Sequence, residues 1–321
     1  MINLFQLDKP SRQKTVKTLA IGNYSVLFLD IIQGLAFVPI FIYYLGGRMY
    51  GLWLGTGGII AILSFLDMGM ATLCVQRVSR EYGKKNYYKV GLYFFNGLLI
   101  NLVFMIILLI SGYIVSRFLN TFFEISNQEF FELSKAFMCA LIALIFALVN
   151  NIIEGVLNAL QKPLLPKLNS VIGAVAGLII TYLLLIKGFG VLSIPIGILI
   201  RNLFGLLPNF VYLIILFLKN NIPLLKFDSA TIKDYLKLSP SVFLSKLGAS
   251  LVSNIEPTLI TMFITPEITV YYSVTKKGGG LVRIIFDRIG SIIYPSLCHL
   301  HASDEIERFK KFILDMIKIL F

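Results

Sequence analysis

Most of this chain consists of apolar blocks, each roughly 20 or more residues long. A bilayer core about 30 Å thick requires about 20 apolar residues in a helix that crosses it. The blocks are continuous rather than short and alternating, which excludes an outer-membrane barrel. Only 14% of the residues are charged and the mean hydropathy is +0.83, whereas a soluble domain carries about 25% charged residues. The sequence therefore predicts an all-α, polytopic transmembrane bundle.

The apolar blocks predict eight spans and the start of a ninth. The eight cover residues 18–45, 50–75, 90–118, 136–160, 168–186, 190–218, 240–265 and 268–298. The ninth begins near Phe309, and the remaining residues to Phe321 are too few to cross a bilayer. We expect either a fragment or a natural truncation that leaves the last helix incomplete.

The distribution of basic residues between connecting segments predicts the orientation. With the N-terminus inside, the inner segments hold 18 Lys and Arg residues and the outer loops hold four, namely Arg48, Arg117, Lys135 and Lys187. Basic residues concentrate in cytoplasmic loops. This rule also accounts for the net charge of +12 without nucleic acid as a partner. We expect a multi-pass protein of the bacterial cytoplasmic membrane with a cytoplasmic N-terminus.

The longest polar inner segment divides the chain. It runs from Lys219 to Ser239 and predicts three parts: a six-helix N-terminal lobe (1–218), a cytoplasmic interlobe linker (219–239) and a partial C-terminal lobe (240–321). Because six spans precede the linker, both lobes start with the same orientation, as a parallel duplication would.

Carboxylates lie where charge is costly. Asp30 shares a helical face with Asn23 and Gln33, and Glu154 lies on a polar stripe with Asn150. The asparagines allow two interpretations, interhelical hydrogen bonding or a wet cavity. A charge in the membrane needs a partner or water, which favours a cavity-facing or proton-coupling role for the carboxylates. The candidate ion-coupling residues are Asp30, Glu154 and Glu256.

Cations outnumber carboxylates by four in the sixth to eighth spans. An internal pair of Arg283 with Asp287 would leave Lys276 and Lys277 unexplained. The excess predicts a cationic cavity for an anionic substrate, most simply a phosphate group. The candidate substrate-binding residues are Arg201, Lys246, Lys276, Lys277 and Arg283.

The sequence offers no candidate residues for catalysis. Cys74, Cys139 and Cys298 lie in or beside apolar segments, and His299 and His301 cannot build a metal or haem site alone. The sequence contains no phosphate-binding loop, metal site or nucleophile–base pair, and the outer loops are too short for a catalytic domain. We therefore expect no catalytic residue, metal or cofactor.

The chain contains an ordered set of short motifs: YGLW at 50–53, DMG at 67–69, QRVSREYG at 76–83, VYYSV at 270–274 and IYPSL at 293–297. This set resembles bacterial oligosaccharide (O-antigen/lipopolysaccharide) flippases of the polysaccharide transporter family, in the MOP flippase superfamily. With the helix count, the resemblance extends over nearly the whole chain. Family members have twelve or more spans, so the second lobe is incomplete here.

The resemblance implies a two-lobed MOP/MATE-like bundle with a complete first lobe and alternating access. It implies flipping of an undecaprenyl-pyrophosphate-linked oligosaccharide for surface polysaccharide assembly. The implied partners are this lipid-linked substrate, membrane lipids, a glycan polymerase and other assembly proteins.

Three alternatives are open. A multidrug/cation antiporter of the same superfamily would favour a carboxylate-rich cavity, and the basic excess argues against it. A membrane polysaccharide polymerase or glycosyltransferase would need a long outer loop with catalytic residues, and the loop at 120–134 is short. A non-transporting assembly scaffold is the third.

Overall fold

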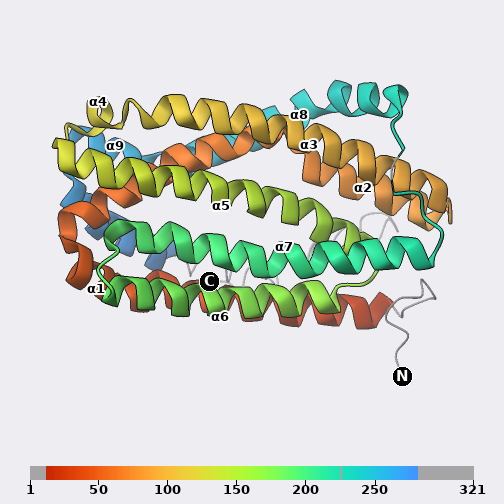
Figure 1. Cartoon of the computed structure of the whole chain (residues 1–321), viewed down its shortest axis with the longest axis horizontal. Helices are drawn as coiled ribbons and strands as arrows, with labels where there is room; N and C mark the ends of the chain where they lie inside the picture. Colours follow the sequence, from red (N-terminus) through yellow and green to blue (C-terminus); the bar gives the residue numbers. More distant parts are fainter. Residues whose placement is uncertain (1–11, 225, 281–321) are drawn as a thin grey trace, which may run out of the picture. The chain divides into compact units, whose positions relative to one another are not determined.

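The computed structural model of this chain describes residues 12–224 and 226–280, and these form a bundle of long helices without strands (Figure 1). Five of the described segments are long and apolar enough to cross a membrane by length and composition: Thr18–Gly83, Tyr87–Ser116, Asn127–Ala159, Leu164–Ile186 and Gly190–Lys219. The first of them contains two of the predicted spans, so these five segments account for the predicted first six.

Helix α1 (Arg12–Leu63) is two arms joined at a kink. Gly46 has φ 76° and ψ 156°, a conformation that a glycine adopts without the steric penalty of a side chain. The chain reverses direction there, and the second arm runs back beside the bundle (Figure 1). It continues through η1 (Ser64–Asp67) into α2 (Met70–Gly83). At this junction the Gly69 amide donates to Asp67 Oδ1 at 2.9 Å while Met68 is left-handed.

Side-chain caps stabilise the N-terminal ends of two of the next helices. Asn86 caps α3 (Tyr87–Ser116) by accepting a hydrogen bond from the Lys89 amide. A short helix, α4 (Leu119–Phe123), follows. Ser126 and Glu129 form a capping box at the start of α5 (Asn127–Ala159), which satisfies free amides at the helix end. Pro163 precedes α6 (Leu164–Ile186), and η2 (Gly190–Leu192) leads into α7 (Ser193–Lys219).

Apolar side chains are found both inside and outside the bundle. Leu52, Leu108 and Phe137 are fully buried between the second arm of α1, α3 and α5. Leu102, Ile106 and other apolar residues of α3 are exposed. An exposed apolar face of this extent is expected for helices that face lipid.

Glycines let α6 and α7 pack closely. A Cβ added to Gly177 would lie 2.7 Å from the Gly197 carbonyl oxygen, and one added to Gly173 would lie 2.6 Å from the Arg201 carbonyl oxygen. Gly173 and Gly177 form a G-x-x-x-G pair, a pattern typical of close helix packing in membranes. Gly55 packs similarly on α9, where the Thr258 hydroxyl donates to the Gly55 carbonyl at 2.6 Å.

The segment predicted as one span at 240–265 is broken. Helix α8 (Ser229–Asn254) begins within the predicted linker, α9 (Glu256–Phe263) follows, and a further helical stretch covers 266–280. Pro257 stands at the start of α9. A proline has no amide hydrogen and clashes with the carbonyl four residues earlier, so it ends the preceding helix.

The connecting segments gather at two ends of the bundle (Figure 1). We call one the kink end (Gly46, 117–126 and 187–192) and the other the linker end (84–86, 160–163 and 220–228). The four predicted outer cations lie at or within about two and a half turns of the kink end, where Arg48 pairs with Glu129 at 2.7 Å. Among the described inner cations, Lys84, Lys85, Lys162, Lys219 and Lys226 lie in or beside the linker end, so these are separated along the bundle from the four outer ones.

The described contacts divide the chain into two compact units, Met1–Tyr272 and Ser273–Phe321. The polar geometry described below lies in the first unit. The division into lobes at 219–239 stays a prediction.

Candidate functional site

An ion pair joins the first and sixth predicted spans. Arg201 Nη1 on α7 lies 2.6 Å from Asp30 Oδ1 on α1, across 171 residues of sequence. Asp30 is near the middle of the first arm, about 24 Å from the kink at 1.5 Å per residue. The Asp30 side chain is 44% exposed and that of Arg201 is 29% exposed. The pair therefore neutralises a membrane-embedded carboxylate without enclosing it between helices.

Helix α6 positions this pair by packing against both α1 and α7. Because Gly173 and Gly177 lack side chains, the backbone of α7 comes within a few ångströms of α6 at Arg201. The close approach lets the long Arg201 side chain extend past α6 to Asp30. The separate predictions for Arg201 as a substrate ligand and Asp30 as an ion-coupling residue thus fall on two halves of one pair.

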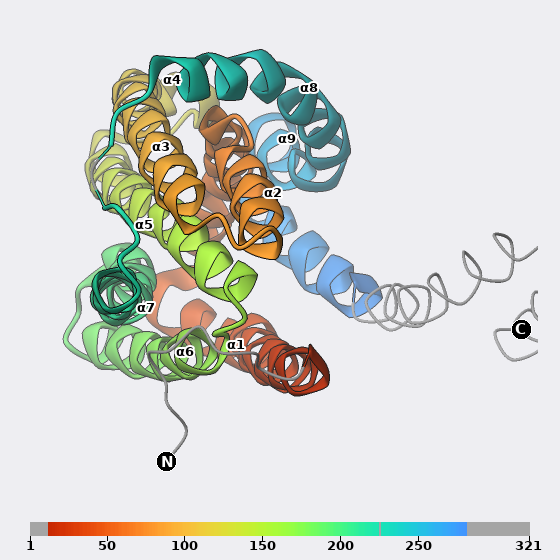
Figure 2. The same ribbon diagram turned by 90° about the vertical axis from the view of Figure 1, so that its right-hand side faces the viewer.

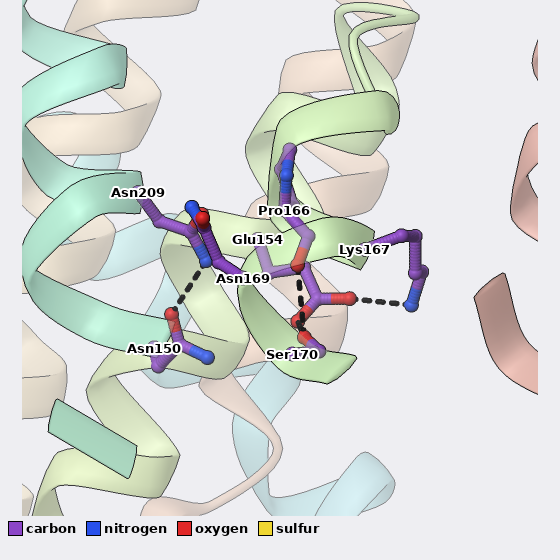
Figure 3. A network of polar contacts seen from close by, with 7 residues as sticks. All are labelled: Asn150, Glu154, Pro166, Lys167, Asn169, Ser170 and Asn209. Carbon is purple, nitrogen blue, oxygen red and sulfur yellow. Dashed lines mark hydrogen bonds and ion pairs between the residues drawn. The ribbon is translucent and has the colours of Figure 1, made fainter. Parts of the chain in front are cut away.

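A second ion pair lies near the linker end. Lys167 Nζ is 2.5 Å from Glu154 Oε1, and the Ser170 hydroxyl is 3.4 Å from Glu154 Oε2 (Figure 3). The Lys167 and Glu154 side chains are only 14% and 16% exposed. A Cβ on Gly22 would lie 2.6 Å from Lys167 Cβ, so the absence of a side chain in α1 makes room for Lys167.

Three asparagines continue this network across α5, α6 and α7 (Figure 3). Asn169 Nδ2 donates to Asn209 Oδ1 at 2.8 Å, and Asn209 Nδ2 donates to Asn150 Oδ1 at 3.0 Å. Asn209 is fully buried. For Asn150, interhelical hydrogen bonding is therefore confirmed.

Sequence reasoning missed most of this network. Lys167 is one of the 18 predicted inner Lys and Arg residues, and the sequence pattern does not single out Asn169, Ser170 or Asn209. The signal was the spacing of Lys167 and Ser170, which puts both on one face of a helix start. Their partner Glu154 is on another helix, so no periodicity within one segment could identify the contact.

The other predicted site residues belong to other elements. Glu256 begins α9, Lys246 lies in α8, and Lys276 and Lys277 lie in the helical stretch 266–280. Arg283 lies outside the described residues. A cavity shared by these cations stays a prediction. Within the described ranges, no group of three His, Cys, Asp or Glu side chains could hold a metal ion.

Comparisons with known proteins identify the fold. The MatE family model matches residues 52–183. The chain is similar to an outward-facing multidrug resistance MATE family transporter of the MOP superfamily, at 18% identity and TM-score 0.61, covering 86% of this chain and 66% of that one. It is also similar to an inward-facing multidrug resistance MATE family transporter of the MOP superfamily, at 16% identity and TM-score 0.62, covering 95% of this chain and 70% of that one.

A third similar structure is the MATE multidrug transporter DinF-BH, at 18% identity and TM-score 0.56, covering 83% of this chain and 60% of that one. The chain thus spans about two thirds of the length of the first structure and less of the third. No curated protein sequence matches it significantly.

The resemblance to oligosaccharide flippases is wrong, because the matching family and structures are MATE rather than polysaccharide transporters. The predicted roles in lipopolysaccharide and O-antigen assembly, which depended on this resemblance, are therefore not supported. The motif residues that the structure describes serve the scaffold: Leu52 is fully buried, Asp67 closes a turn and Arg77 pairs with Asp234. Such contacts belong to the helix packing and do not identify a substrate.

The predicted fold class is confirmed. The similar proteins named above are transporters, which agrees with the prediction that the chain is not an enzyme. The chain has the MATE-like fold of a multi-pass membrane transporter.

Proposed function

We propose that this chain is the membrane-spanning part of an antiporter that exports organic cations in exchange for a proton or sodium ion. The likeness to multidrug transporters supports this class of substrate. The separation of 18 from four basic residues supports a place in the bacterial cytoplasmic membrane with the N-terminus inside.

The observation that carries the proposal is the Asp30–Arg201 pair. The Asp30 carboxylate lies at mid-span, is paired with one cation and is still 44% exposed. A proton, a sodium ion or an organic cation that reaches Asp30 must compete with Arg201 for the same carboxylate. Competition for one group couples the two ligands, because each lowers the affinity for the other.

The exchange then proceeds through Asp30. A proton that binds the carboxylate removes its charge and releases Arg201 from the ion pair. The helices α1 and α7 lose one mutual contact, which favours a different arrangement of the bundle. When the proton leaves, the carboxylate again attracts Arg201 or a cationic substrate.

The basic excess that argued against a cation exporter is smaller in the structure. Asp30, in the first predicted span, neutralises Arg201, which is one of the cations in the sixth to eighth spans. An organic cation approaching Asp30 therefore does not meet an unpaired arginine there.

The test uses the full-length protein in proteoliposomes and measures ethidium efflux driven by an imposed proton or sodium gradient. We expect the parent to export ethidium and Asp30→Asn to lose gradient-driven export at least tenfold, since an amide cannot take up the coupling ion. Glu124→Gln removes an exposed carboxylate at the kink end and serves as the control. Export by Asp30→Asn at the parental rate would show that coupling does not use this residue.

The orientation has its own test. A cysteine at Lys84 or Lys226 should be unreactive toward an impermeant thiol reagent in intact cells and reactive in inverted vesicles. The opposite pattern would reverse the proposed topology without affecting the antiport proposal.

A further inference from the structure

A separate feature lies at the linker end, outside the polar pairs. The start of α8 crosses over α3 and α2 there (Figure 2). The Asn96 side chain holds the preceding linker by donating to the Lys226 carbonyl at 2.8 Å and accepting from the Asp228 amide at 3.0 Å. The Tyr235 hydroxyl donates to the Tyr93 carbonyl at 3.1 Å. The segment is therefore fixed on the bundle.

This segment has two different faces. Thr231, Tyr235 and Ser239, at successive four-residue intervals, are buried against the bundle. The opposite side exposes Lys233, Leu236 and Lys237, and Leu236 is 47% exposed. The result is a helix whose outer side mixes lysines with an exposed leucine.

The linker before α8 extends this outer side. Phe227 is 65% exposed. Lys226 Nζ stands 4.5 Å from the centroid of the Tyr88 ring, which belongs to the first turn of α3, within range of a cation–π contact. We call Lys226, Phe227, Lys233, Leu236 and Lys237 the linker surface.

The two acidic residues near the linker surface, Asp228 and Asp234, form contacts within the protein. Asp234 pairs with Arg77 at 2.7 Å, and Asp228 accepts hydrogen bonds from the Thr231 amide and hydroxyl. Lys226, Lys233 and Lys237 form no ion pair with a carboxylate in the described part of the chain. The linker surface therefore presents three positive charges outward.

We propose that the linker surface binds anionic phospholipid headgroups. It follows α7 directly at the end of a membrane-spanning segment, where headgroups lie. Lysines beside aromatic and leucine side chains suit this boundary, since the cations attract lipid phosphates while the apolar groups enter the acyl region. Its two exposed apolar side chains are too few for the contiguous patch of a protein interface.

The experiment uses a single tryptophan beside the surface. Trp53 is the one tryptophan of the chain, so Trp53→Phe with Phe227→Trp moves the fluorophore into the linker surface. Full-length protein in vesicles containing brominated phosphatidylglycerol or brominated phosphatidylcholine gives the relative binding constant of the two lipids from quenching. We expect selectivity for the anionic lipid.

Matched variants separate local binding from net charge. Lys226→Gln, Lys233→Gln and Lys237→Gln together should lower the selectivity about tenfold, while Lys→Arg at the same positions should retain it. Arg117→Gln, Lys135→Gln and Lys187→Gln remove the same charge at or near the kink end and should leave it unchanged. Equal quenching by both lipids in the parent, or unchanged selectivity in the linker triple variant, would overturn the proposal.

Discussion

Two ion pairs between the long helices, Glu154–Lys167 and Asp30–Arg201, have the same chemistry in different surroundings. Glu154–Lys167 is enclosed, with side chains 16% and 14% exposed and Ser170 as an additional partner. Asp30–Arg201 is open, with side chains 44% and 29% exposed. The cost of separating a pair depends on whether water can replace the lost partner. We infer that the enclosed pair stabilises the bundle and that the open pair is free to exchange partners.

The largest effect is expected when Lys167 is removed from the enclosed pair. Lys167→Met leaves the Glu154 carboxylate enclosed without its cation, and we expect a loss of about 3 kcal/mol of stability. Thermal unfolding of the full-length protein in detergent measures the change. The matched control is Lys187→Met, which removes an exposed lysine at the other end of α6 and should have little effect. Adding Glu154→Gln to Lys167→Met should recover most of the loss; no recovery would mean that the pair is not the cause.

The next variant tests how the open pair is positioned. Gly177→Ala puts a Cβ 2.7 Å from the Gly197 carbonyl oxygen and 3.0 Å from Arg201 Cβ, so α6 and α7 must separate. We expect a loss of about 2 kcal/mol in the same unfolding assay. Gly57→Ala is the control because its added Cβ meets nothing within 4 Å and alanine favours a helix. Equal midpoints for the two variants would contradict the packing argument.

The open pair itself should contribute little to stability. Arg201→Gln leaves Asp30 without its cation but less enclosed than Glu154, so its carboxylate can turn toward water or take up a proton at a lower cost. The unfolding midpoint should therefore change less than in Lys167→Met. A drop as large as that of Lys167→Met would show that both pairs are structural, and the distinction drawn above would fail.

The smallest effect is expected at Asp228, in the linker. Its hydrogen bonds from the Thr231 hydroxyl and amide lower its pKa below the ordinary 3.8. A carboxyl with a lowered folded-state pKa stabilises the fold above its unfolded pKa and loses this contribution as the pH falls through the folded value. The parent should therefore lose slightly more stability than Asp228→Asn when unfolding midpoints are compared between pH 6 and pH 3. If the unfolding midpoints of the parent and of Asp228→Asn fall equally between pH 6 and pH 3, Asp228 does not contribute to the pH dependence of stability.

The helical bundle follows from the sequence because hydrophobic blocks and basic segments act within single helices. Residues 168–186, for example, predict α6 within four residues of its observed start. The break near Pro257 was missed because hydropathy alone joins α8 to α9. The position of the start of α8 depends on Asn96, which is 132 residues away from Asp228.

The candidate site was only half predictable. Charges at Asp30, Glu154 and Arg201 stand out because they are costly in a membrane. Their partners depend on helix packing, and Asp30 and Arg201 meet only because glycines let α7 approach α6. The resemblance to oligosaccharide flippases was wrong for a related reason. Motif residues such as Asp67 and Gly69 form a turn of the helical scaffold and do not identify a substrate.

Asn96 has a consequence for how this sequence can diverge. Its one buried amide group binds the linker backbone at Lys226 and Asp228, and backbone groups are the same whatever side chains accompany them. Substitutions in the linker therefore leave both hydrogen bonds available, whereas inserting or deleting a residue between these two positions removes one of them. Natural variants of this chain should keep the length of this stretch while its composition changes.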